Sequence, residues 1–131
     1  MRTAAAIAAL ALSACSPNLV GDWTGRCEFN QYNIEVELEL KEQSNKDGVS
    51  GDAQAQLIFT NGSDAPPIFY EGDFEGSFED DELDIDLDVA GSDGTNGSFS
   101  IEAVYNKDKD EFEGECINGG EDGDIELEFE G

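Results

Sequence analysis

Beyond residue 18, the apolar residues of this chain fall on every second position over most of its length. Ile34, Val36, Leu38 and Leu40 alternate with three glutamates, and residues 83–89 alternate with aspartates in the same way. A period of two is typical of β-strands with one buried and one solvated face, and no helical period is evident. The pattern therefore predicts an all-β fold.

Polar turn residues divide this pattern into short segments. Asn45–Gly48, Asp80–Asp81 and Asn106–Asp110 are turns, and Pro66 and Pro67 mark a longer loop. The eight predicted inward rows are residues 23–29, 34–40, 49–59, 68–78, 83–89, 99–105, 112–116 and 125–129. Closure of such a meander removes its exposed edges. We predict an eight-stranded antiparallel up-and-down barrel over residues 19–131, with a two-sheet β-sandwich as the alternative.

The start of the chain follows a different pattern. Arg2 precedes an alanine- and leucine-rich apolar run, Thr3–Leu12, and small residues then lead to Cys15. This is the organisation of a signal peptide. The run reaches only about 15 Å as a helix, roughly half of a bilayer core, so a permanent membrane span is not expected. We predict a signal peptide over residues 1–14 that is removed on export.

The four residues from Leu12 to Cys15, L-S-A-C, resemble the lipobox of bacterial lipoproteins. The resemblance implies cleavage before Cys15 and attachment of a diacylglycerol to its thiol. Residues 15–18 would then be a lipid-anchored tether, and Ser16 after the cysteine suits the outer membrane by resemblance to enterobacterial sorting. The alternative is an ordinary secretory signal cut after Ala14.

The chain has three cysteines, an odd number for an exported protein. If Cys15 is acylated, Cys27 and Cys116 remain as one pair in an oxidising compartment. In an eight-strand meander the first and seventh strands run the same way and both flank the eighth, so these two cysteines reach the same rim. We predict a disulfide between them.

The charge of the chain restricts its partners. Six basic and thirty-two acidic residues give a net charge of −26, which becomes −27 when Arg2 leaves with the signal. Such a surface excludes nucleic acid and an anionic membrane surface as electrostatic partners and favours cations or a basic protein. The chain has no histidine, which removes most familiar hydrolase mechanisms. We expect no enzymatic activity and no cofactor.

Gly21-Asp22-Trp23, at the start of the first predicted strand, resembles the G-x-W motif that opens the barrel of the calycins, the superfamily of lipocalins, fatty-acid-binding proteins and avidins. The strands rich in aromatic residues and glycine are similar to those of small bacterial lipocalin-like lipoproteins. The resemblance implies a barrel but no particular ligand. The alternative is a tryptophan that plugs one end of any β core.

The inward rows mix large rings with a belt of glycine and alanine, and this mixture allows two interpretations. A pocket for a small apolar ligand is the first. Its predicted lining is Trp23, Phe29, Tyr70, Phe74 and Tyr105. In a barrel of eight strands, however, side chains can just fill the interior, and we favour this second interpretation.

Two acidic features are candidates for cation or partner binding. Asn106, Asp108 and Asp110 alternate in one turn and present hard oxygen ligands of the kind calcium prefers, although the EF-hand template does not fit and a solvated turn is the commoner explanation. Carboxylates also fill the outward rows, such as residues 35–39 and 84–88. We prefer a general charge bias, as in a saline habitat, to a docking face for a basic partner.

The sequence thus predicts a non-enzymatic, lipid-anchored barrel of the cell envelope, either structural or binding a small apolar ligand. It would be exported and held in the outer membrane, on its periplasmic or surface face. The alternative function is a surface module that binds calcium or a partner through its acidic loops and faces. A third hypothesis is an enzyme inhibitor or accessory subunit that recognises a basic target.

Overall fold

The computed structural model describes residues 17–44, 47–62 and 64–131. The regular secondary structure of these residues consists of β-strands. The predicted signal peptide, Cys15, Ser16 and part of the predicted turn Asn45–Gly48 lie outside these residues. The strands are β1 (Gly21–Glu28), β2 (Tyr32–Gln43), β3 (Gly48–Phe59), β4 (Ile68–Glu79), β5 (Glu82–Gly91), β6 (Asn96–Asn106), β7 (Glu111–Asn118) and β8 (Glu121–Phe129).

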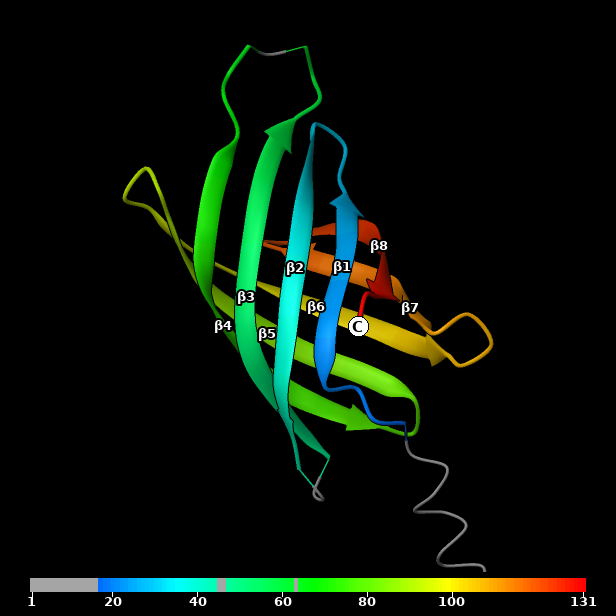
Figure 1. Ribbon diagram of the computed structural model, residues 1–131. Helices are drawn as coiled ribbons and strands as arrows, with labels where there is room; N and C mark the ends of the chain where they lie inside the picture. The colour runs from blue at the N-terminus through cyan, green and yellow to red at the C-terminus, as the bar shows by residue number, and fades with distance from the viewer. Residues whose placement is uncertain (1–16, 45–46, 63) are drawn as a thin grey trace, which may run out of the picture.

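Each strand pairs antiparallel with the next along the chain, and β8 pairs back onto β1. The sheet is therefore a closed barrel in up-and-down order. This confirms the predicted barrel and rules out the two-sheet sandwich. In Figure 1, β1 to β3 run upright at the front, while β5 to β8 cross behind them at a large angle.

Two ends of the barrel are distinguished below. The N-terminal pole holds residues 17–20 and the connections β2–β3, β4–β5 and β6–β7. The distal pole holds the connections β1–β2, β3–β4, β5–β6 and β7–β8, and Figure 1 places the long β3–β4 connection at the opposite end from the N-terminus.

Burial follows the period of two. Along β5 the side chains of Leu83 and Val89, and the two apolar residues between them, are buried, whereas every intervening aspartate is exposed. The same alternation in the other strands gives one contiguous apolar core. Within the described part of the chain, no polar or charged residue is buried. Removal of this apolar surface from water is the main force that stabilises the barrel.

Glycines in the inward rows allow neighbouring strands to approach each other closely. A Cβ atom at Gly72 in β4 would collide with the carbonyl oxygen of Asp88 in β5, and one at Gly76 would collide with that of Asp84. Glycine inside a strand commonly marks such an approach or a bend. These glycines therefore shape the closed sheet, and they do not open space inside it.

The predicted disulfide is confirmed. Cys27 of β1 and Cys116 of β7 are bonded, with 6.0 Å between their Cα atoms and a sequence separation of 89. Both side chains are fully buried, and both strands pair with β8, as the meander requires. A loop of this length gives about 4 to 5 kcal/mol of stabilisation when chain entropy alone is considered.

Candidate functional site

The five residues predicted to line a ligand pocket are part of the packed core or lie against it. Trp23, Phe29 and Phe74 are buried, while Tyr70 and Tyr105 are partly buried. Trp23 and Phe74 meet at an enclosed void in the interior, but its volume is about 10 Å³. A void of roughly this size holds at most one water molecule. The interior around Trp23 is therefore filled, in agreement with the favoured interpretation.

The remaining three rings are distributed over the two poles, with Tyr70 opposite Gly91 at the distal pole. Phe29 stacks on Tyr32 at the distal pole, with ring centroids 4.8 Å apart. Tyr105 packs on Phe112 near the N-terminal pole, at 5.2 Å. The predicted lining residues thus do not form one site.

The segment before β1 is held across the N-terminal pole by a group of residues that we name the N-terminal clasp, consisting of Pro17, Leu19, Trp23 and Gln43. The amide of Gln43 donates to the carbonyl oxygen of Pro17 (3.0 Å) and accepts from the backbone N–H of Leu19 (2.8 Å). The indole Nε1 of Trp23 donates to the carbonyl oxygen of Leu19 (2.8 Å). The side chain of Leu19 is only 1 % exposed, so it closes this end of the core.

Sequence reasoning missed Gln43 because the clasp depends on a bulge in β2. The register between β2 and β3 shifts between Leu40 and Glu42, and Gln43 then pairs with Val49, which is buried. A bulge adds one residue to one strand and moves the following side chains to the other face. The only signal in the sequence is an uncharged glutamine within a highly charged segment.

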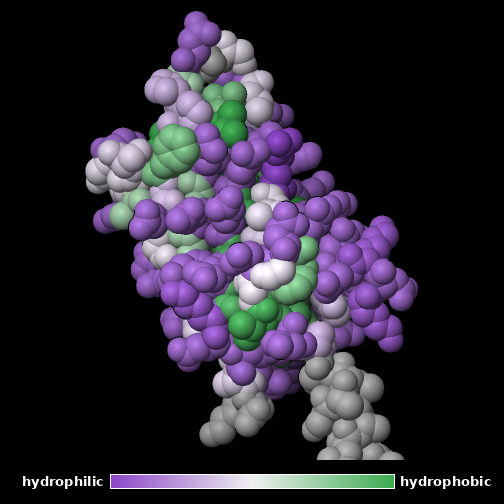
Figure 2. Space-filling model, viewed as in Figure 1, coloured by the Kyte–Doolittle hydropathy of each residue, from purple (hydrophilic) through white to green (hydrophobic). Residues whose placement is uncertain are grey.

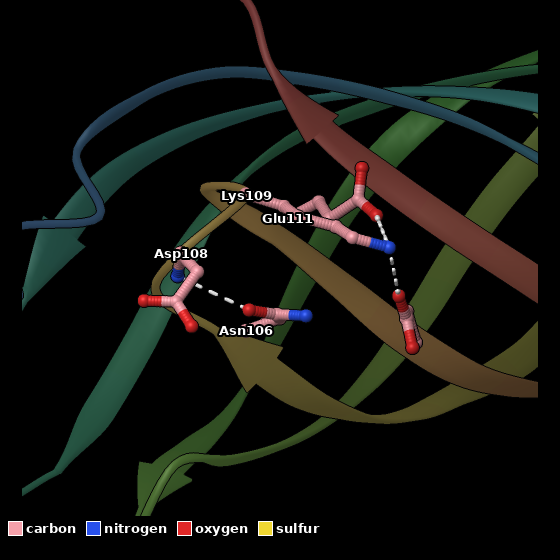
Figure 3. Close-up of polar contacts among 5 residues, drawn as sticks. Asn106, Asp108, Lys109 and Glu111 are labelled. Carbon is pink, nitrogen blue, oxygen red and sulfur yellow. Dashed lines mark hydrogen bonds and ion pairs between the residues drawn. The ribbon is translucent and has the colours of Figure 1, made fainter.

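Two of the three predicted calcium ligands accept hydrogen bonds from nearby groups, and Figure 3 shows the contact of Asn106. The Oδ1 atom of Asn106 accepts from the backbone N–H of Asp108 (3.1 Å). The Oδ1 atom of Asp110 accepts from the hydroxyl of Tyr105 (2.8 Å). The described residues contain no group of three or more cysteine, aspartate or glutamate side chains placed to hold a metal ion. The geometry is that of a solvated turn.

Lys109 adds positive charge to this turn. Its Nζ lies 3.7 Å from a carboxylate oxygen of Glu113 and 4.0 Å from one of Glu111, as the dashed lines in Figure 3 show. A cation at this position would meet the lysine as a competitor for the same carboxylates.

The hydroxyl of Tyr105 is the most perturbed group near this turn. Burial raises the pKa of Tyr105 to about 12, and the hydrogen bond to Asp110 and the charges of Asp110 and Asp81 act in the same direction. The protonated phenol therefore acts as a structural donor that links β6 to the β6–β7 turn.

A second tyrosine joins two connections at the distal pole. The side-chain amide of Asn118 donates to the hydroxyl of Tyr32 (3.1 Å), which donates to Glu121 (3.3 Å). Burial raises the pKa of Tyr32, the hydrogen bond from Asn118 lowers it, and Glu121 raises it again. This contact holds the start of β2 against the β7–β8 turn.

The outer surface carries rows of carboxylates that face each other across the strands. One row runs in register from Glu39 through Asp52 and Asp73 to Asp88, and another passes through Asp84, Glu102, Glu115 and Asp124. Like charges directly opposite each other destabilise a sheet. Figure 2 shows how far hydrophilic side chains cover the visible face.

Few cations oppose these rows. Arg26 lies 2.8 Å from Glu35, and Lys41 lies 2.7 Å from Asp52. Every partner in these two pairs is more than a third exposed, and exposed ion pairs stabilise little. The surface is therefore dominated by unneutralised negative charge.

An open groove of about 870 Å³ lies on the outer face of the barrel, where β1 and β8 meet. Its floor includes Gly25 and Gly114, and its walls carry seven glutamate and aspartate residues in addition to Arg26. The groove provides a strongly negative concave surface, but no buried polar group points into it.

Comparison with known proteins identified no relative of this chain. No protein-family model, curated protein or solved structure matches the chain. In the ranges that the structure describes, no helix has the length and apolar character needed to cross a membrane. Fold and surface define the class of the molecule as a closed, filled and strongly acidic antiparallel β-barrel.

Proposed function

We propose that this chain is an exported, lipid-anchored protein of the cell envelope whose barrel is a rigid, non-enzymatic structural body. The proposal rests on how the three cysteines of the chain are distributed. Cys27 and Cys116 are paired inside the barrel, which leaves Cys15 as the third cysteine, directly after the apolar leader. Disulfides persist in oxidising compartments, and Cys15 is the residue at which the lipobox resemblance places the anchor.

The N-terminal clasp supports a defined orientation for an anchored barrel. Pro17 follows Cys15 by two residues, and its carbonyl oxygen is bound by Gln43 at the N-terminal pole. A lipid on Cys15 would therefore hold this pole against the membrane and direct the distal pole away from it.

The packing of the interior favours a structural role over transport of a small apolar ligand. The void lined by Trp23 and Phe74 measures about 10 Å³, whereas ligand pockets typically have several hundred. The resemblance of Gly21-Asp22-Trp23 to the calycin motif agrees with a barrel whose strands follow chain order, and it requires no ligand.

Metabolic labelling tests the anchor. The full chain and its Cys15→Ser variant are expressed in a Gram-negative bacterium in the presence of radioactive palmitate. We expect label in the wild-type protein and its recovery with the outer membrane, and both are expected to be lost in Cys15→Ser. The Cys116→Ser variant is the control for loss of a cysteine that keeps the anchor, and immunoblotting checks that it accumulates, because it also removes the disulfide. An unlabelled, freely released wild-type protein would instead indicate an ordinary secretory signal.

Native mass spectrometry of the protein purified from its own host tests the structural role. We expect the mass of the polypeptide with its lipid and nothing else. A stoichiometric additional small molecule would favour the ligand-binding version.

A further inference from the structure

One end of the barrel lacks the charge that dominates the rest of the surface. Between Ala53 and Tyr70 the sequence contains a single charged residue, Asp64, in a chain of which 29 % is charged. This stretch comprises the distal half of β3, the β3–β4 connection and the start of β4.

The alternation of buried and exposed residues also ends there. We name Leu57–Phe59 together with Pro66–Tyr70 the hairpin tip. The apolar residues of β3 are consecutive here, and so are those of β4, with Leu57 opposite Ile68. No residue of the hairpin tip is fully buried, and the side chain of Phe69 is 57 % exposed. The tip therefore presents apolar surface on both faces of the sheet.

The hairpin tip lies at the distal edge of the sheet, where pairing with the neighbouring strands ends. β5 ends at Gly91, which pairs with Tyr70, and the last backbone hydrogen bond on this side runs from the N–H of Ser92 to the carbonyl oxygen of Phe69. On the other side β2 begins at Tyr32, opposite Phe59. Figure 1 shows the β3–β4 connection rising above the remaining strands, and Figure 2 shows hydrophobic side chains gathered near this end.

We propose that the hairpin tip is a docking element that inserts into an apolar cleft of a protein partner. A ribbon at the end of the barrel with apolar side chains on both faces is covered best by a concave surface that encloses it. Exposed apolar surface of this kind on an otherwise charged protein commonly marks an interaction site. The aromatic side chain of Phe69 is the type of residue that anchors such interfaces.

The charges around the hairpin tip specify the rim of that cleft. Glu71 follows Phe69 on the same outer face, Asp64 lies in the connection, and Glu121 borders the cleft of about 240 Å³ beside Phe59. Their carboxylates are complementary to lysine and arginine, so a basic rim around an apolar floor fits the tip.

Other occupants fit less well. A second copy of the chain offers the same convex tip and the same net charge of −26, so two tips would meet over a small area while their bodies repel each other. An anionic membrane repels the body in the same way. The proposal goes beyond the structural role above, and it does not require the lipid anchor.

Site-specific crosslinking in the protein's own host tests the docking. Phe69 is replaced with the photoreactive analogue p-benzoylphenylalanine, and Val104 is replaced in the same way as a control. Val104 is also exposed (53 %), but it lies on the outer face of β6 between Glu82 and Glu113. We expect one adduct from position 69 and none from position 104. The crosslinked peptide of the partner is expected to line an apolar cleft flanked by lysine or arginine.

Calorimetry with the purified partner then tests the contribution of the tip. Phe69→Asp is expected to weaken binding by at least about tenfold, Val104→Asp is expected to leave it unchanged, and added salt is expected to weaken binding of the wild type. Thermal unfolding checks that both variants fold, and Phe69→Ser replaces Phe69→Asp if the latter does not.

Several outcomes would overturn the proposal. These are no adduct at position 69, an adduct with lipid or with a second copy of the chain, or wild-type affinity in the position 69 variant. The palmitate label on Cys15 is read separately, so failure of docking and failure of the anchor are distinguishable.

Discussion

Gln43 joins the segment before the first strand to the barrel. Its amide makes two hydrogen bonds, one to the carbonyl oxygen of Pro17 and one from the N–H of Leu19. Both backbone groups lie at a partly buried position, where an unpaired polar group is costly. One side chain thereby fixes the path of the segment before β1, and the buried side chain of Leu19 closes this end of the core.

Gln43→Ala is expected to lower the free energy of unfolding by about 1 to 2 kcal/mol, because it leaves both backbone groups without their partner. Urea unfolding measures this change, and hydrogen exchange at Leu19 is expected to accelerate. The matched control is Gln54→Ala on the exposed face of β3, which should change neither quantity. Equal stability of the two variants would show that the clasp contributes nothing.

Tyr105 links protonation to stability at high pH. Its pKa is about 12 in the folded protein and 10.0 when unperturbed. Between these two pH values the folded state therefore keeps the phenolic proton, whereas the unfolded state loses it. The contribution of Tyr105 to the free energy of unfolding is complete below pH 10 and is lost as the pH rises towards about 12.

Tyr105→Phe is expected to lower the free energy of unfolding by about 1 kcal/mol at neutral pH, because the hydrogen bond to Asp110 is lost. The difference between wild type and variant should shrink as the pH approaches the pKa of Tyr105. Denaturant unfolding over this range, together with titration of tyrosinate absorbance, measures both effects. A difference that does not depend on pH would contradict the assignment.

At the scale of elements, β4 illustrates how inward glycines control the shape of the sheet. Gly72 and Gly76 face the core, and in each case the backbone of β5 occupies the place of a Cβ atom. β4 and β5 therefore approach each other closely at these two glycines, where a side chain would hold them apart.

Gly72→Ala is expected to lower the free energy of unfolding by about 2 to 3 kcal/mol, because the added methyl group forces β4 and β5 apart. Gly97→Ala in β6 is the control, since the nearest atoms to its Cβ would lie at an ordinary 3.8 Å. Denaturant unfolding compares the two. Equal tolerance of both substitutions would show that the strands can separate without loss of packing.

At the scale of the whole molecule, the balance between the apolar core and surface repulsion determines stability. The core is buried, and the disulfide joins β1 to β7 inside it. Outside, opposed carboxylates such as Asp73 and Asp88 have few cations near them. Salt screens interactions between exposed charges, so the stability of this protein should depend on ionic strength.

We expect the melting temperature to rise by roughly 5 °C or more from low to molar sodium chloride, which corresponds to about 1 kcal/mol for a domain of this size. The double variant Asp73→Asn, Asp88→Asn should show a smaller rise, because one directly opposed pair is absent. Differential scanning calorimetry measures both proteins. A melting temperature that is unchanged by salt would mean that repulsion is not a significant contribution.

The class of fold could be predicted from the sequence because its determinants are local. A period of two decides which face of each strand is buried, and turn residues such as Asp80 and Asp81 separate the strands. Eight strands in a meander favour a closed barrel over a two-sheet sandwich, and the barrel places Cys27 and Cys116 at the same rim. The structure has both the closure and the disulfide.

Other features were decided only by the tertiary structure. The bulge after Leu40 changes the face of the sheet on which Gln43 lies, and no local sequence pattern predicts this bulge. Inward rings and glycines are equally compatible with a pocket and with a packed core. Whether space remains depends on how closely the strands approach around Gly72, which is a property of the closed sheet.

The sequence by itself thus determined the strands, their order and the acidic outer face, because each depends on residues that are near one another in the chain. The filled interior, the N-terminal clasp and the exposed hairpin tip depend on the relative lengths and registers of strands. Those quantities are settled only when all eight strands pack together, since each register minimises exposed apolar surface against two neighbours at once.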